Sequence, residues 1–292
     1  MAVFEGSGVA IITPFKDGAV DFDAFGALVD WQVDEKTDAI VVAGTTGEAS
    51  TLTDEEQIDL ISYTVKRVAG RVPVIAGVGS NFTEHGLSLT KGAEKAGADA
   101  LLHVTPYYNK ASKKGLIEHF KAMATATSLP ILLYSVQGRT GMNIAPDVCE
   151  ELAQIPNIVG IKEASGNIAQ VVEIARRAPE GFDLYSGNDD MIVPLLSVGG
   201  KGVISVLANV APRDTHDMVR KYLDGDVKGA AALQLQTKAL IDALFCEVNP
   251  IPVKAALYMM GKCAYEYRLP LCQMEDGNFE ILRKEMQAYG LI

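Results

Sequence analysis

Eight short apolar runs, rich in β-branched residues, recur along the first two thirds of the chain. They occupy 8–15, 39–48, 72–80, 98–108, 130–136, 158–165, 183–189 and 200–209. The runs are followed by segments in which apolar and charged residues recur with helical spacing, as in 53–70 and 83–97. Strands that alternate with helices form parallel β–α–β units, and eight such units predict a (β/α)8 TIM barrel of the α/β class.

A doubly wound sheet is the alternative fold. It usually carries a Gly-x-Gly-x-x-Gly turn, and residues 77–82 hold only two of those three glycines. After the last strand, helical patterns exceed what the eighth barrel helix needs, and they occupy 212–224, 226–244, 251–261 and 277–289. We therefore predict a barrel over 1–225 and a C-terminal helical appendage over 226–292 that packs on it.

Charge and composition narrow the classes of partner. The net charge is −11 and the 26 basic residues form no long run, which disfavours nucleic acid and acidic membranes. The four cysteines lie far apart, as free thiols in a reducing compartment do. The N-terminal residues lack the basic start of a signal peptide, and no stretch reaches the roughly 18 apolar residues of a membrane span. These features predict a soluble, cytoplasmic protein.

Lys162 interrupts the apolar run at 158–165. Side chains alternate along a strand, so Gly160, Lys162 and Ala164 share one face while Val159 and Ile161 share the other. If the apolar pair faces the helices, Lys162 points into the barrel between two small residues. A buried lysine with a lowered pKa is a nucleophile that forms Schiff bases with carbonyls. A lysine paired with a carboxylate, or one reaching out to solvent, is the alternative.

Other polar residues fall at predicted strand ends, where the catalytic groups of TIM barrels lie. Tyr134 ends the fifth strand and offers a phenol for proton transfer. Thr45 and Thr46 lie in a glycine-flanked turn that is suited to a carboxylate, and Arg139 supplies a forked cation for a second one. Each also has a structural interpretation, as a core aromatic, strand-end hydroxyls or a surface charge. No metal site is expected, because the four histidines (85, 103, 119 and 216) have no helical i, i+4 partner and no nearby cysteine.

Seven motifs, in order along nearly the whole chain, resemble the dihydrodipicolinate synthase family of pyruvate-dependent Schiff-base lyases. They are "GTTGE" (44–48), "TPYYN" (105–109), "YSVQGRTG" (134–141), "GIKEASGN" (160–167), "SGND" (186–189), "GVISV" (202–206) and "NPIPVK" (249–254). The resemblance implies a TIM barrel with added C-terminal helices and a homotetramer built as a dimer of dimers. It also implies condensation of pyruvate with L-aspartate 4-semialdehyde to 4-hydroxy-tetrahydrodipicolinate, for lysine and diaminopimelate biosynthesis, without a cofactor.

The resemblance assigns roles to the candidate residues. Lys162 forms the Schiff base, and Tyr134 is the acid and base, with a proton relay through Thr45 to Tyr108 of an adjacent subunit. The remaining substrate-binding residues are Thr46 and the backbone of Gly187 and Ile204 for pyruvate, and Arg139 for the semialdehyde. The chain departs from the family at Ser135 and Gln137, where the pattern usually has Asn and Pro; the lost proline puts the placement of the Arg139 loop in question.

Two rival functions share parts of this pattern. A sister aldolase, such as an N-acetylneuraminate lyase or a keto-sugar-acid aldolase, has the same lysine and tyrosine, but Arg139 and "GTTGE" favour the small amino-acid aldehyde. A non-catalytic pyruvate-binding relative is expected to have lost Lys162 or Tyr134, and both are present.

The resemblance also implies a regulatory site for L-lysine. The corresponding positions here are Ser50, Gln57, Asn81, His85 and Tyr107. In lysine-sensitive members the position of His85 is typically a glutamate and that of Gln57 a histidine. A lysine ammonium needs acceptors and preferably a negative charge, which His85 does not supply. We therefore expect weak feedback inhibition, unless a neighbouring acid such as Glu84 compensates.

Overall fold

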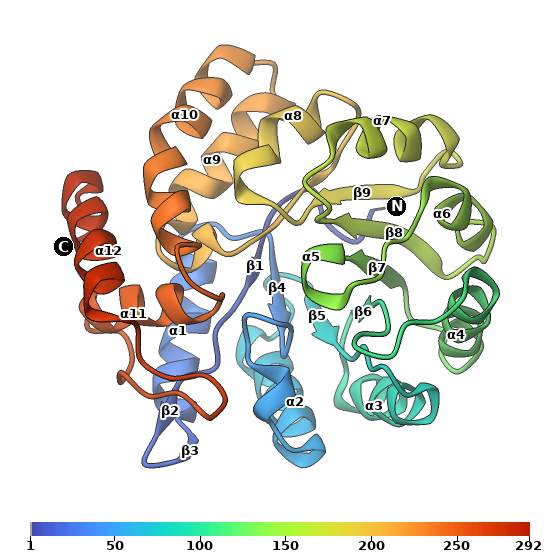
Figure 1. The fold of residues 1–292 in the computed structure, drawn as a ribbon, viewed down its shortest axis with the longest axis horizontal. Coiled ribbons are helices and arrows are strands. Elements are labelled where there is room, and N and C mark those ends of the chain that lie inside the picture. The colour runs from blue at the N-terminus through green and yellow to red at the C-terminus, as the bar shows by residue number, and fades with distance from the viewer. Residues whose placement is uncertain (1) are drawn as a thin grey trace.

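The computed structural model describes residues 2–292, and its centre is a closed barrel of eight parallel strands (Figure 1). The strands are β1 (Gly6–Ala10), β4 (Ala39–Val42), β5 (Val74–Gly77), β6 (Ala100–Val104), β7 (Ile131–Ser135), β8 (Ile158–Glu163), β9 (Asp183–Ser186) and β10 (Gly202–Ser205). Each overlaps one predicted run and pairs with its neighbours in chain order, with β10 closing on β1. The predicted TIM barrel is confirmed, and the doubly wound sheet is excluded.

Helices surround the barrel (Figure 1). The outer ring contains α1 (Phe22–Asp34), α2 (Asp54–Val68), α3 (Thr83–Ala96), α4 (Lys113–Thr125), α6 (Pro146–Leu152), α7 (Ile168–Arg177), α8 (Ile192–Leu196) and α9 (Pro212–Leu223). Short helical turns at the strand ends are η1 (Ala49–Thr51), α5 (Gln137–Thr140), η2 (Asp189–Met191) and η3 (Leu207–Asn209). A small hairpin that the sequence patterns did not indicate joins β2 (Phe15–Lys16) to β3 (Ala19–Val20).

The C-terminal residues form α10 (Val227–Leu244), α11 (Ile251–Met259) and α12 (Asp276–Tyr289). With α9, they match the four helices expected after the last strand to within two residues at each end. In Figure 1, α11 and α12 lie on one side of the barrel, next to α1 and the β2–β3 hairpin. Within residues 2–292 no helix is both long enough and apolar enough to cross a membrane.

Two apolar layers result from strand alternation. The larger layer fills the space between the strands and the surrounding helices. The smaller layer fills the barrel interior, and its members include Ala10, Val41, Ile75, Leu102, Leu132, Tyr134, Tyr185 and Ile204. Phe4, which precedes β1, stacks on Tyr185 with ring centroids 4.4 Å apart. The interior is therefore a packed core, as small barrels require.

One prediction about β8 is wrong. Val159 was expected to face the helices, but it packs against the interior cluster. The reason is a register shift against β7: Ile131 pairs with Ile158 and Leu132 with Gly160, so Val159 has no partner. Such a bulge resets the alternation. From Gly160 onward the predicted phase holds, with Ile161 in the outer layer.

The segment after α11 is fastened to the loops at the top of the barrel. Arg268 donates to both carboxylate oxygens of Glu56 at 2.7 and 2.6 Å, and to the carbonyls of Thr51 and Gly18. Glu56 also closes a capping box with Thr53 at the start of α2. The hydrogen bonds from Arg268 lower the pKa of Glu56 to about 2, against an ordinary value of 4.5.

We expect Glu56→Gln to destabilise the protein by about 1 to 2 kcal/mol near pH 7, because a charge-assisted pair is lost while glutamine keeps the capping box. The pKa of Glu56 is lower in the folded state, so the pair's contribution is complete above about pH 4.5. That contribution is lost as the pH falls towards 2. Urea unfolding of both proteins at pH 7 and pH 3 should show the difference shrinking at the lower pH. A constant difference would assign the effect to packing.

Candidate active site

A cavity of about 530 Å³ opens at the C-terminal ends of the barrel strands. The candidate residues that line it are Thr45, Thr46, Ser50, Gln57, His85, Tyr107, Tyr134, Arg139 and Lys162. They come from strand ends, loops and helices far apart in the sequence, which the barrel brings to one end because all its strands are parallel. Nine of the 23 residues that line the cavity were therefore candidates from the sequence.

Lys162 lies in the barrel interior, as the alternation on β8 predicted. Only 5% of its surface is exposed. It is in register with Tyr134 on β7, and its Nζ lies 4.2 Å from the centre of the Tyr134 ring. A methyl group at Gly187 would come within 3.1 Å of Lys162 Cε and 2.6 Å of Ala164 Cβ. Small residues beside the lysine therefore keep open the space that its side chain and a bound carbonyl need.

The turn at 44–48 is tightly constrained on both sides. Ala43 and Glu48 both have positive φ, 53° and 56°, a conformation that non-glycine residues seldom adopt. A Cβ at Gly47 would be crowded, because it would lie 3.2 Å from the nitrogen of Ala43 and from the carbonyl oxygen of Ile11. Within this turn Thr45 is exposed and Thr46 is buried. The constraint fixes which threonine hydroxyl points into the protein.

Arg139 lies at the rim of the cavity, on the four-residue helix α5. Its Nη1 donates to the carbonyl of Asn249 at 3.2 Å. The two departures from the family pattern lie just before this helix and at its first residue. Ser135 is buried and turned away, with Oγ bonded to Asn143 and accepting from the nitrogen of Ile144, while Gln137 is the first helical residue. Because that position suits proline but does not require it, the loop forms its helix with glutamine.

The structure places Gly187 beside Lys162 and Ile204 in the apolar layer of the barrel interior. Gly187 is beside Lys162, and its nitrogen donates to the carbonyl of Glu163 at 2.7 Å. The Ile204 side chain is fully buried in the interior cluster. The cavity lining includes neither residue, and the Gly187 nitrogen is already bonded within the barrel.

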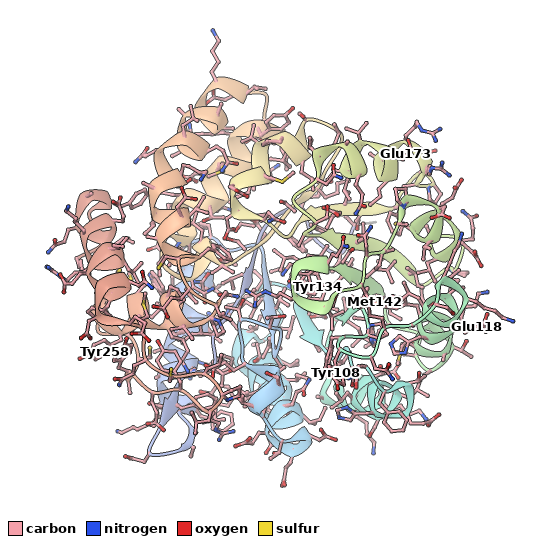
Figure 2. All side chains as sticks on the ribbon, in the orientation of Figure 1. Tyr108, Glu118, Tyr134, Met142, Glu173 and Tyr258 are labelled. Carbon is pink, nitrogen blue, oxygen red and sulfur yellow. The ribbon has the colours of Figure 1, made fainter. Side chains whose placement is uncertain are left out.

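Tyr108 is not brought to Tyr134 within this chain. It is 91% exposed and has a φ of 67°. Figure 2 shows Tyr134 near the centre of the barrel mouth and Tyr108 on the loop that follows β6. A strained backbone that projects an exposed aromatic ring is the kind of outlier that marks a functional contact.

Four residues of the expected lysine site, Ser50, Gln57, His85 and Tyr107, line the same cavity, and Asn81 contacts one of them. Asn81 Nδ2 donates to the carbonyl of Tyr107 at 3.1 Å. The acid that lies against His85 is Asp54 and not Glu84: Asp54 Oδ1 is 2.8 Å from His85 Nε2. Asp54 could not be identified from the sequence, because only the packing of α2 on α3 places it against His85.

Two further buried groups were not identified from the sequence. Lys254 Nζ donates to Glu48 Oε1 at 2.5 Å, and both side chains are almost wholly buried. Burial raises the pKa of the Glu48 carboxyl and lowers that of the Lys254 ammonium. Asp189 accepts from Ser205 Oγ at 2.6 Å and from two backbone nitrogens after β10. A lysine inside the apolar pattern of 251–261 was the available signal for the first of these.

Within residues 2–292 no three side chains of His, Cys, Asp or Glu converge as metal ligands do.

Comparisons with known proteins identify relatives over nearly the whole chain. The model of the "Dihydrodipicolinate synthetase family" matches residues 3–289. A 4-hydroxy-tetrahydrodipicolinate synthase from Caldicellulosiruptor bescii is 58% identical over 100% of this chain and 99% of its own. The crystal structure of dihydrodipicolinate synthase from Aquifex aeolicus superposes with a TM-score of 0.97 at 46% identity, covering 99% of each chain. The structure of the Cyanidioschyzon merolae synthase with lysine bound has a TM-score of 0.97 at 41% identity, covering 100% of each chain.

The family model spans nearly the whole chain, and the relatives match it over their full length at identities far above those at which only the fold is shared. The chain belongs to the dihydrodipicolinate synthetase family.

Proposed function

We propose that this chain condenses pyruvate with L-aspartate 4-semialdehyde through a Schiff base on Lys162. The product is 4-hydroxy-tetrahydrodipicolinate, a precursor for lysine and diaminopimelate. Membership of the family supports the reaction. The observation that carries the mechanism is a buried lysine in contact with a tyrosine ring at the C-terminal mouth of the barrel.

The chemistry needs an amine, a proton carrier and two anion sites. The Lys162 nitrogen attacks the pyruvate ketone, and water leaves to give an iminium. The iminium accepts electrons as the methyl group loses a proton, and the resulting enamine attacks the aldehyde of the second substrate. The amino group of that substrate then attacks the iminium carbon, closes the ring and releases Lys162. Tyr134, whose ring lies 4.2 Å from the Lys162 nitrogen, is our candidate for the proton transfers.

Two groups on the cavity wall are suited to the two carboxylates. The Thr46 hydroxyl, with the backbone near Gly187 and Ile204, is assigned to pyruvate. Arg139 at the rim is assigned to the semialdehyde, since a guanidinium binds a carboxylate with two parallel hydrogen bonds. The larger substrate then enters after the smaller one is fixed at the bottom of the cavity.

Tyr108 is assigned to the site of an adjacent protomer, with Thr45 linking it to Tyr134. Its 91% exposure and positive φ support this assignment. We also propose that two such dimers form a tetramer. Ile168 and Val172, four residues apart on α7, are exposed apolar side chains that an interface would cover.

Borohydride reduction in the presence of pyruvate should add a pyruvate-derived mass to Lys162. Lys254 is a built-in control, because it is equally buried but bonded to Glu48. Peptide mass spectrometry should find Lys162 modified and Lys254 unmodified. Lys162→Arg should abolish trapping without unfolding the protein, because guanidinium keeps the charge but forms no useful imine. An adduct on another lysine would refute the mechanism.

Tyr134→Phe and Tyr108→Phe should each reduce turnover by roughly 10²–10⁴, as expected for loss of a proton carrier. If Tyr108 acts across subunits, mixing inactive Lys162→Arg and Tyr108→Phe proteins should restore activity as subunits exchange. Random pairing makes half the dimers mixed, each with one intact site, so about a quarter of wild-type activity should return. Mixed oligomers that stay inactive would place Tyr108 in its own chain's site.

Lysine should inhibit this protein weakly, with half-inhibition above about 1 mM near pH 7. Asp54 is the nearest carboxylate, but it is held by His85, so the ligand's ammonium has to compete for it. Neutral hydrogen bonds from the remaining residues are about half as strong as charge-assisted ones. His85→Glu should strengthen inhibition in steady-state assays, and Glu84→Gln is the matched control that should not change it. Submillimolar inhibition of the wild type would contradict this expectation.

A further inference from the structure

The start of α11 touches the turn at 44–48 at two points. Asn249 Nδ2 donates to Thr46 Oγ1 at 3.0 Å, and Lys254 Nζ donates to Glu48 Oε1 at 2.5 Å. More than 200 residues separate the two partners in each contact. A C-terminal segment outside the barrel strands therefore contacts the turn that is assigned to the keto acid.

The first contact sets the direction of a hydroxyl proton. A threonine hydroxyl donates one hydrogen bond and can accept others. Because the Asn249 amide occupies an acceptor position of Thr46, the hydroxyl proton is free to point elsewhere. An anion in the cavity is the partner it fits. Asn249 thus makes Thr46 a donor at the position where a carboxylate has to be held.

The second contact holds the backbone of the same turn. Glu48 is in the left-handed region, and its nitrogen donates to the carbonyl of Thr45 at 3.1 Å. Lys254 is 1% exposed, and its Nζ lies over the rings of Phe15 and Tyr267 at 4.3 and 4.9 Å. Removal of either charge leaves the other buried without a partner, which proteins tolerate poorly. The pair therefore holds Glu48 in place. Because the Glu48 nitrogen is bonded to Thr45, the pair also limits the movement of Thr45 and Thr46.

The same segment also reaches the other anion-binding group. The carbonyl of Asn249 accepts from Arg139 Nη1 at 3.2 Å. The Asn249 side chain donates to Thr46, and its backbone carbonyl accepts from Arg139. One residue therefore contacts both groups that are assigned to the two carboxylates. Substitution of the side chain leaves the backbone carbonyl in place, which allows the two roles to be separated.

We propose that Asn249 and Lys254 are positioning residues for pyruvate: Asn249 orients the Thr46 hydroxyl, and the Lys254–Glu48 pair fixes the turn that carries it. The proposal rests on the function proposed above, specifically on Thr46 as a ligand of the pyruvate carboxylate. Neither residue touches the reacting atoms. Their loss should weaken pyruvate binding and leave the Schiff-base chemistry at saturation intact.

The test measures the pyruvate concentration that gives half-maximal borohydride trapping on Lys162, which needs no second substrate. Asn249→Ala should raise this pyruvate concentration about tenfold, which is the equivalent of one lost charge-assisted hydrogen bond. Asn249→Asp, of nearly the same size, should raise it further, because a carboxylate takes the Thr46 proton and repels the substrate. Trapping at saturating pyruvate and the KM for the semialdehyde should change less than twofold in Asn249→Ala.

Asn157→Ala is the matched control. Like Asn249, Asn157 donates hydrogen bonds through its side-chain amide, in this case to the backbone carbonyls of Ala124 and Thr127. It lies just before β8, at the opposite end of that strand from Lys162. The substitution should lower the melting temperature without changing the pyruvate requirement. If Asn249→Ala behaves in the same way, or raises the requirement for both substrates equally, Asn249 is only a structural anchor and the proposal for it is wrong.

The ion pair needs a neutral replacement, because Lys254→Met alone can unfold the protein. Glu48→Gln/Lys254→Met removes both charges at similar volume. It should fold, because no buried charge is left without a partner, but it should need about tenfold more pyruvate than wild type, because the turn has lost its attachment to α11. A double variant that folds and needs no more pyruvate than wild type would overturn the role of the pair. Absence of trapping in the wild type would instead overturn the proposed function, and this proposal with it.

Discussion

The closure of eight short parallel strands into a barrel is the constraint on which the rest of the molecule depends. Closure sends every second side chain into a narrow interior, and the strands are only four to six residues long. Most of that interior is filled by apolar residues from Phe4 to Ile204. Lys162 enters near the C-terminal end, where the layer opens into the cavity. The position of Lys162 follows from this geometry and from the bulge at Val159, which sets the phase of β8.

The same geometry explains why the site is assembled from many loops. Strand ends supply Lys162 and Tyr134 with little freedom, because both are held in a paired ladder. The loops supply the groups that we assign to the substrate carboxylates, and these loops need outside support. The C-terminal segment around α11 provides it, through Asn249, Lys254 and Arg268. Lys162 and Tyr134 are thus held in place by strand pairing, and the loop groups by their contacts with this segment.

Much of this could be predicted from the sequence. Strand runs and helical periods gave the barrel and the C-terminal helices, because both depend on local patterns. The lysine was recognisable as a charge within an apolar run. The bulge at Val159 could not be read from alternation, since it depends on the register against β7. The pairing of Glu48 with Lys254 and of His85 with Asp54 also required the fold, because each joins residues from different elements.

The Glu48–Lys254 pair has a consequence for the order in which the chain is made. Lys254 follows Glu48 by 206 residues, so a ribosome adding 5–20 residues per second delivers it roughly 10 to 40 s later. During that interval the Glu48 carboxyl, which is buried in the folded protein, has no cationic partner. This carboxyl must stay hydrated, or be protonated, until the C-terminal segment has been made. The early strands can form before synthesis ends, but the part of the cavity that we assign to pyruvate is completed only after nearly the whole chain has been translated.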